Sequence, residues 1–407
     1  MTGATQLRRS GMRSLVIVLT VALVVVALVS QTVAIHKVMA REDVPLVTDL
    51  DRDLLAADAV DRGMQPFTTL GELKPDLPAE WAQTWVAHSP LAIVMARGLS
   101  EFGDRSWVVA VYRWVSLVAL VSLILLLIRW RSRDRLLILA AITVAVWAPT
   151  VSDLRWVQTH ALVALGLAAV LALYSESRRW WALALLGFLV AWKPWLAFLA
   201  LFLPGSSAPW RDVFRVGLVS AGLTIAVLPW AGGWDALRAW LLEAMPSNTE
   251  LSREIHTGIL SFTAEMPLVF ATVTYVALVI VTVILGRRMF GPQVLPALGG
   301  LTHLAFGPLV WDHYWLALLP AVCWPIIHGS ADPIVRRVVG AWLVLSALSH
   351  PINSAIESPA WVDYLAYGFV MGVPVALVVL WWSALRGSGL KGLHPMTGVT
   401  PAADAAL

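Results

Sequence analysis

The stretch RWWALALLGFLVAWKPWLAFLALFLPGSSAPWR, from Arg179 to Arg211, decides the fold. Arginines mark cytoplasmic connections under the positive-inside rule, so both ends of the stretch belong on one side of a membrane. A chain that leaves and returns in about 30 residues forms two helices that each rise only ~18 Å, against a ~30 Å hydrocarbon core. The sequence therefore predicts a short helix pair whose tip carries Lys193-Pro194. The lysine lies inside the outer half of the bilayer, where a charge needs a partner.

The rest of the chain is equally apolar. Of its 407 residues 59% are hydrophobic and 14% are charged, with 22 tryptophans, and the mean hydropathy is +0.75. Apolar stretches of spanning length recur along the chain, which predicts an all-α polytopic membrane protein with about 12 membrane helices, the short pair included. The expected spans are roughly 15–35, 106–128, 136–150, 158–174, 180–192, 194–204, 213–230, 266–285, 293–310, 314–327, 338–350 and 363–384.

Short arginine-rich connections give these spans an orientation. Placed in the cytoplasm, they put both termini inside and the first outer loop, 36–105, outside. The first segment is long for a secretory signal, so we interpret it as a signal-anchor. We expect one transmembrane domain over 1–385 and a disordered cytoplasmic tail over 386–407. The basic residues lie mainly between spans, so the net charge of +3 does not indicate nucleic-acid binding.

The first outer loop is acidic. Seven of the chain's 26 acidic residues fall between Glu42 and Asp61. The segment TDLDRDLLAADAVDRGMQPF, from Thr48 to Phe67, is typical of an amphipathic helix. Its residue pattern places a cap at Thr48 or Asp49 and an end near Gly63. Two interpretations stay open for its carboxylates: bases beside a membrane-anchored substrate, or a cap and a solvated surface.

Cationic and aromatic residues at the same outer side are the other candidates. Lys193 is either a phosphate ligand or a snorkelling lysine in an ion pair. In SDLRWVQTH, 152–160, Arg155 and Gln158 could add hydrogen-bond donors, although Arg155 is also typical of an interfacial anchor. In WDHYW, 311–315, His313 could donate to a phosphate oxygen; an aromatic belt is the alternative.

Several other site types are missing from the sequence. It contains no P-loop, GxGxxG, HExxH or Ser/Cys triad pattern, and Cys323 is its single cysteine. An intrachain disulfide and a cysteine metal site are therefore excluded. No metal-ligand cluster or cofactor motif is evident, so we expect neither a metal nor a cofactor.

These motifs, in order over about 45–330, resemble the GT-C glycosyltransferases that use polyprenyl-phosphate sugars. They are most similar to glycosyltransferase family 87 and its actinobacterial alpha-1,2-mannosyltransferases. The matching positions are Asp49, Ala56-Ala57, Gly63, Pro66-Phe67, Ser89-Pro90-Leu91, Val157-Gln158-Thr159-His160, Lys193-Pro194 and Trp311-Asp312-His313-Tyr314. The chain departs from the family pattern in three places. Arg52 and Asp53 replace aromatic residues, Val157 replaces a glycine, and Tyr314 replaces a second histidine.

The resemblance implies a GT-C fold in a bacterial plasma membrane, with the active site on the extracytoplasmic side. It implies inverting transfer of a sugar, mannose first, from a polyprenyl-phosphate donor to a lipid-linked or cell-envelope glycan. Asp49 would be the catalytic base, with Asp51 or Asp53 as possible substitutes. Lys193, His313 and Arg155 would bind the donor phosphate, and Gln158, Trp195, Trp311 and Tyr314 would line the substrate.

Two alternatives remain at this point. The donor could carry a pentose, as in arabinofuranosyltransferases of the same family, because both donors share the phosphate. The protein could instead be a lipid or glycan transporter. A transporter is expected to distribute polar residues through its spans, whereas here they gather at one face. The oligomeric state is left open.

Overall fold

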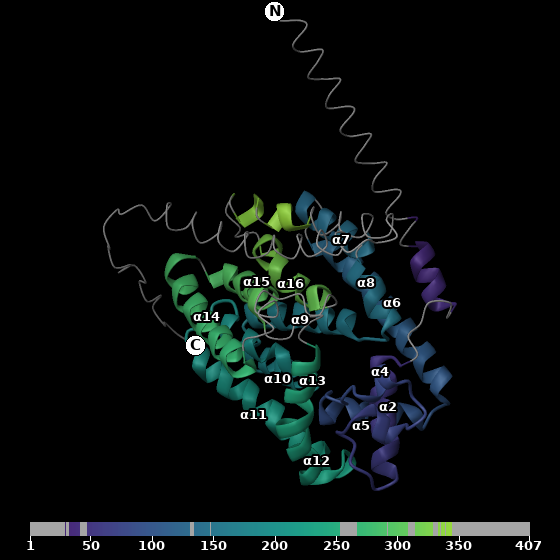
Figure 1. Cartoon of the computed structure of the whole chain (residues 1–407). Coiled ribbons are helices and arrows are strands. Elements are labelled where there is room, and N and C mark those ends of the chain that lie inside the picture. The colour runs from purple at the N-terminus through teal and green to yellow at the C-terminus, as the bar shows by residue number, and fades with distance from the viewer. Residues whose placement is uncertain are drawn as a thin grey trace, which may run out of the picture.

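The computed structural model is a helical molecule with a layer of short helices at one end (Figure 1). It describes residues 29, 32–40, 47–130, 134–146, 148–252, 267–290, 292–307, 314–328, 333, 335–337 and 339–343. Within these ranges every regular element is a helix, and β pairing is limited to an isolated bridge between Thr69 and Trp85. The expected all-α fold class is confirmed for this part of the chain.

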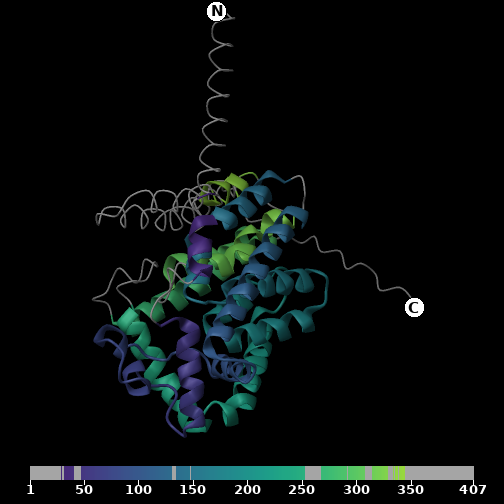
Figure 2. The ribbon, with the colours of Figure 1, turned by 90° about the vertical axis from the view of Figure 1, so that its right-hand side faces the viewer.

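The layer at the lower end in Figures 1 and 2 combines two distant stretches of sequence. We call it the outer layer. Its helices are α2 (Asp49–Asp61), α3 (Leu70–Leu73), α4 (Ala79–Ala82), α5 (Pro90–Ser100), α12 (Gly233–Ala239), the π-helix η3 (Trp240–Ala244) and α13 (Met245–Ser252). Phe67, Leu70, Ile93 and Trp240 are buried together within it. The outer layer therefore has a hydrophobic core of its own.

The larger part of the molecule is a bundle of apolar helices. Its elements are α6 (Arg105–Trp130), α7 (Arg135–Val146), α8 (Ala148–Arg155), α9 (His160–Ser175), α10 (Arg179–Trp192), η1 (Pro194–Phe202), α11 (Pro209–Val227), η2 (Leu228–Trp230), α14 (Leu268–Met289), η6 (Pro292–Val294), α15 (Leu295–Phe306) and α16 (Tyr314–Ile327). Every residue of α16 is buried, and this helix packs against α9 and α15. An apolar helix with no polar face belongs in the interior, so α16 forms the centre of the bundle.

Three of the described helices are long and apolar enough to cross a membrane: α6, α11 extended through η2, and α14. The count becomes four if the bent pair α7 and α8 forms one span, and α5, α9, α10 and α16 are shorter apolar helices. Large apolar side chains such as Val118, Leu218 and Val273 are exposed on the long helices. These features are those of an all-α membrane protein, but the expected 12 membrane helices are not confirmed. The expected spans 15–35 and 338–350 lie largely, and 363–384 and the tail 386–407 wholly, outside the described residues.

The short helix pair forms as expected, with one difference. Its first half, α10, is a 14-residue α-helix, and the chain breaks at Lys193 with φ −127° and ψ 85°. Its second half, η1, is a 3₁₀-helix of nine residues that begins at Pro194, instead of an α-helix. A 3₁₀-helix rises about 2 Å per residue, so η1 spans roughly 18 Å and the pair stays shorter than a full membrane crossing.

Candidate functional site

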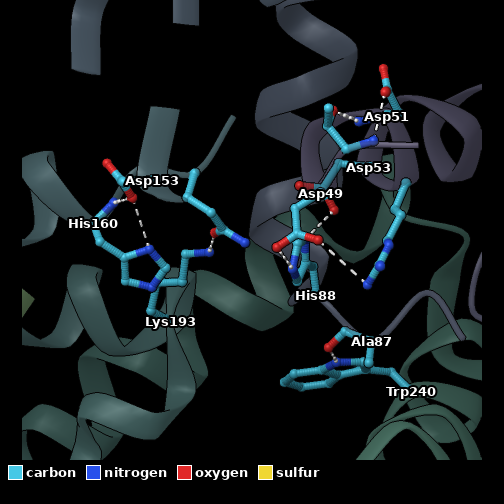
Figure 3. Close-up of polar contacts among 12 residues, drawn as sticks. Asp49, Asp51, Asp53, Ala87, His88, Asp153, His160, Lys193 and Trp240 are labelled. Atoms are coloured by element: carbon cyan, nitrogen blue, oxygen red, sulfur yellow. Dashed lines mark hydrogen bonds and ion pairs between the residues drawn. The ribbon is translucent and has the colours of Figure 1, made fainter. Parts of the chain in front are cut away.

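The candidate site lies where the outer layer meets the bundle, at the first turn of α2 (Figure 3). Thr48 caps this helix: its hydroxyl accepts from the Asp51 amide at 3.2 Å, and its own amide donates to Asp51 Oδ2 at 2.8 Å. This reciprocal pair is a capping box, which fixes the start of the helix. The Asp49 amide donates to the Trp156 carbonyl at 3.1 Å. The backbone at Asp49 is thereby joined to the chain that follows α8.

Asp51 and Asp53 are buried, so the interpretation of these two carboxylates as a solvated surface is wrong. Asp51 is 3% exposed and Asp53 is 8% exposed. Asp51 completes the capping box and accepts from Arg105 Nε at 2.6 Å, while Asp53 Oδ1 lies 2.8 Å from His88 Nδ1. Both carboxylates are buried because α5 and α6 pack against α2, which no periodicity in the helix itself reveals.

The remaining carboxylates of α2 differ in how far they are exposed to solvent. Asp58 and Asp61 lie at exposed positions and pair with Arg62 and Arg97. Asp49 keeps a side chain that is 15% exposed. It lies 3.4 Å from Arg52 Nη1 and 3.8 Å from His88 Nε2. Asp49 is thus a carboxylate that is held between two cationic or ionisable groups and still reaches solvent.

Lys193 and Gln158 meet at the tip of the short helix pair. The Lys193 Nζ donates to Gln158 Oε1 at 3.3 Å. Gln158 is itself held through its backbone: its amide donates to the Asp153 carbonyl at 2.7 Å, and its carbonyl accepts from the Ser116 hydroxyl at 2.9 Å. The two residues were expected to contribute to one site from separate motifs, and the structure brings them together.

The acidic and basic parts of the site act on each other. The negative charges that act on the Lys193 ammonium are those of Asp49, Asp53 and Asp153. Asp153 is fully buried, and its carboxylate accepts from the His160 amide at 3.0 Å, with His160 Nδ1 at 3.2 Å. A carboxylate at this position caps the start of α9. Carboxylates of both α2 and α8 therefore act on the Lys193 ammonium.

Aromatic rings cover the bundle side of this cluster. Trp195 stacks on Tyr314 with ring centroids 4.1 Å apart, and on His160 at 6.1 Å. Trp195 also stacks on His303 at 5.2 Å, and His303 stacks on Phe198 at 4.5 Å. Trp195 and Tyr314, both expected to line the substrate, thus belong to one group of stacked rings. Trp195 follows Lys193 by two residues, and both rings lie near His160.

The structure does not assign the other three predicted site residues to this cluster. Arg155 ends α8 with an exposed side chain. Trp311 and His313 lie outside the described residues, so their roles remain predictions. Among the residues that the structure describes, no three His, Cys, Asp or Glu side chains form a group that could hold a metal ion.

Sequence patterns missed two residues of the site. His88 contacts both Asp49 and Asp53, and Asp153 anchors the connection that carries Gln158. The available signals were weak. His88 directly precedes the motif Ser89-Pro90-Leu91, and Asp153 lies within the quoted segment 152–160. A lone histidine in a loop has no periodic neighbours that would predict its partners.

Val157 has an unusual backbone conformation. Its φ is +54°, in the left-handed region, which costs a β-branched residue of order 1–3 kcal/mol and glycine almost nothing. Val157 is buried with Leu50 and Val108, and burying a valine side chain contributes about 1.5–3 kcal/mol. Burial therefore offsets the backbone strain.

Comparison with known proteins gives a partial relationship. No family model matches the chain. Over 100 residues it is 30% identical to a polyprenol-phosphate-mannose-dependent alpha-(1-2)-phosphatidylinositol pentamannoside mannosyltransferase of Mycolicibacterium smegmatis. The similarity covers 22% of this chain and 24% of that relative, so the chain matches about a quarter of its length. This similarity indicates a relationship to glycosyltransferases, whereas membership of glycosyltransferase family 87 stays a prediction.

Proposed function

We propose that the protein is a membrane glycosyltransferase that transfers a sugar, most readily mannose, from a polyprenyl-phosphate donor to a glycan acceptor. The observation that carries the proposal is that one short connection holds both residues: the Trp156 carbonyl accepts from the Asp49 amide at 3.1 Å, and the Gln158 side chain accepts from the Lys193 ammonium at 3.3 Å. Sugar transfer from a phosphate needs one group to accept a proton and another to stabilise the departing anion. The partial similarity to a mannosyltransferase points to the same chemistry.

Asp49 is proposed as the general base. The acceptor hydroxyl attacks the anomeric carbon of the donor and forms the new C–O bond, while its proton passes to the Asp49 carboxylate. Of the α2 carboxylates near the boundary, Asp51 is committed to the capping box and Arg105, and Asp53 to His88. Asp49 differs from both: its side chain is 15% exposed, and its contacts to Arg52 and His88 are long, at 3.4 and 3.8 Å.

Lys193 is proposed as the donor-phosphate ligand. As the anomeric C–O bond breaks, its electron pair leaves with the phosphate, and a nearby ammonium stabilises the charge that develops. The 3.3 Å bond to Gln158 orients the ammonium. His313 and Arg155 are proposed as further phosphate ligands. Gln158, Trp195, Trp311 and Tyr314 are proposed to line the substrate, since aromatic faces are suited to the apolar face of a sugar.

We further propose that the acceptor is a lipid-linked or cell-envelope glycan and that the reaction takes place at the extracytoplasmic face of a bacterial plasma membrane. A polyprenyl donor is confined to the membrane, so an acceptor that is anchored there meets it at high effective concentration. The candidate site lies at the end of the bundle, beside the tip of a helix pair that is too short to cross. A headgroup could reach such a position.

Reconstituted protein tests the proposal directly. Proteoliposomes receive a β-linked polyprenyl-phosphate mannose with a radiolabelled sugar, together with a bacterial glycolipid extract as acceptor. We expect label in an α-linked glycolipid and release of polyprenyl phosphate, because inversion accompanies single displacement. If the protein transfers arabinose from polyprenyl-phosphate arabinose in preference to mannose, the donor sugar is a pentose and the mannose assignment is wrong. Movement of the donor between leaflets without sugar transfer would contradict the proposed glycosyltransferase activity and favour a transporter.

A further inference from the structure

His88 occupies a position that the proposed chemistry leaves unexplained. It lies between two carboxylates on one face of α2, with Nδ1 2.8 Å from Asp53 Oδ1 and Nε2 3.8 Å from Asp49 Oδ2. Figure 3 shows the ring reaching up to both side chains from the segment below them. One histidine therefore bridges the proposed base and a carboxylate that is otherwise buried.

In a neutral ring, the two contacts give each nitrogen a different role. An ionised carboxylate can only accept a hydrogen bond, so Nδ1 carries the proton that is donated to Asp53. In the neutral ring Nε2 then has a free lone pair, and this lone pair is on the side of Asp49. The arrangement places a proton acceptor next to the proposed base.

The segment that carries His88 is anchored on both sides. The preceding Ala87 carbonyl accepts from Trp240 Nε1 at 3.1 Å, and the Ser89 hydroxyl donates to the Trp192 carbonyl at 3.0 Å. Trp240 begins the π-helix η3; π-helical turns are rare and concentrate at functional sites. Trp192 directly precedes Lys193. The anchors thus tie His88 to the outer layer and to the tip of the short helix pair at once.

We infer that His88 positions Asp49 and accepts the proton that Asp49 removes from the acceptor, an inference that rests on the proposed function. The acceptor O–H bond breaks and its proton goes to Asp49 Oδ2. The proton then passes to His88 Nε2, which restores the Asp49 carboxylate. The imidazolium that results lies between the charges of Asp49 and Asp53, with Arg52 as the opposing cation near Asp49. The His88 side chain is 24% exposed, so the proton can leave to water.

Two variants separate this role from a structural one. In His88→Asn the side-chain amide can still donate to Asp53, as Nδ1 does, but nothing replaces Nε2. We expect kcat for mannose transfer to fall about 100-fold, the lower end of general acid–base contributions, with the donor KM unchanged. In His88→Ala, added imidazole should restore at least a tenth of the lost activity. His36→Asn, at an exposed position at the start of the first outer loop, is the control and should transfer normally.

The outcomes keep the inference and the proposed function apart. The assay uses labelled polyprenyl-phosphate mannose and a glycolipid extract in proteoliposomes, with melting curves to confirm that each variant is folded. If the wild type transfers mannose and His88→Asn keeps kcat within about twofold, proton transfer from Asp49 to His88 is overturned and the proposed function stands. Failure of imidazole to activate a folded His88→Ala has the same meaning. If the wild type transfers no sugar at all, the proposed function is contradicted, and so is the role inferred for His88.

Discussion

At the scale of single residues, Asp49 carries the sharpest prediction. Asp49→Asn keeps the shape and the polar contacts of the side chain but removes its basicity. If Asp49 is the general base, kcat should fall by about 10²–10⁴-fold, and binding of polyprenyl-phosphate mannose should change little, because the base acts on the acceptor. Transfer assays combined with donor binding by calorimetry measure the two effects.

The matched control for Asp49 lies on the same helix. Asp58 has the same side chain two turns further along α2, is 61% exposed and pairs only locally with Arg62. Asp58→Asn should therefore transfer sugar at the wild-type rate. Wild-type turnover of Asp49→Asn, or an equal loss in both variants, would remove Asp49 from the role of base.

Lys193 allows binding and stability to be separated. Lys193→Met keeps the length of the side chain and removes its charge. If the ammonium binds the donor phosphate, loss of a charge-assisted bond worth about 1.5–3 kcal/mol should weaken donor affinity roughly 10–150-fold. The melting temperature, measured without donor, reports separately on what the ammonium contributes to the stability of the fold. Lys37→Met, at an exposed position, is the control.

A structural ion pair makes the opposite prediction for Lys193. If the lysine serves only to neutralise Asp49, Asp53 and Asp153, Lys193→Met leaves these carboxylates uncompensated. Such a change costs about 3–5 kcal/mol. A variant that melts early but binds the donor as tightly as the wild type would therefore support the structural interpretation and contradict the phosphate contact.

At the scale of elements, the position of the Lys193 tip depends on how closely α10 packs on α11. A Cβ added at Gly187 would lie 2.6 Å from Val219 Cβ and 3.2 Å from the Val216 carbonyl. Small residues allow this close approach between membrane helices. Gly187→Ala should therefore lower the melting temperature and donor affinity together, because overpacking costs about 1–3 kcal/mol and displaces the tip.

Gly217 provides the control on the partner helix. A Cβ at Gly217 meets nothing within 4 Å, and alanine is favoured over glycine in a helix by up to about 1 kcal/mol. Gly217→Ala should thus leave the protein as stable or more stable, with donor affinity unchanged. Thermal melting in one detergent compares the pair. Equal stability of both variants would show that the contact between α10 and α11 is looser than the structure indicates.

At the scale of the whole molecule, the sequence predicted what local patterns encode. Arginine spacing and apolar runs predicted the short pair and its lysine tip, and the residue pattern predicted a helix start at Thr48 or Asp49, which the structure places at a Thr48 cap. Burial of Asp51 and Asp53 escaped prediction, because it arises when α5 and α6 cover α2. His88 escaped because its partner Asp53 is 35 residues away. The 3₁₀ form of the second half escaped prediction, because side-chain periodicity in a uniformly apolar run does not separate the two helix types.

Orientation in the membrane is the prediction that concerns the entire chain. Cys323 is its single cysteine and is buried, so a Cys323→Ala background leaves no native thiol to react. Asp58, in the outer layer, and Ser207, in the connection between η1 and α11, are both exposed. The proposed orientation places them on opposite sides of the membrane. In intact cells, a membrane-impermeant maleimide should label Asp58→Cys but not Ser207→Cys, and both should react once the membrane is permeabilised. Labelling of Ser207→Cys alone would reverse the orientation and place the Asp49 site in the cytoplasm, where an extracytoplasmic glycan could not be the acceptor.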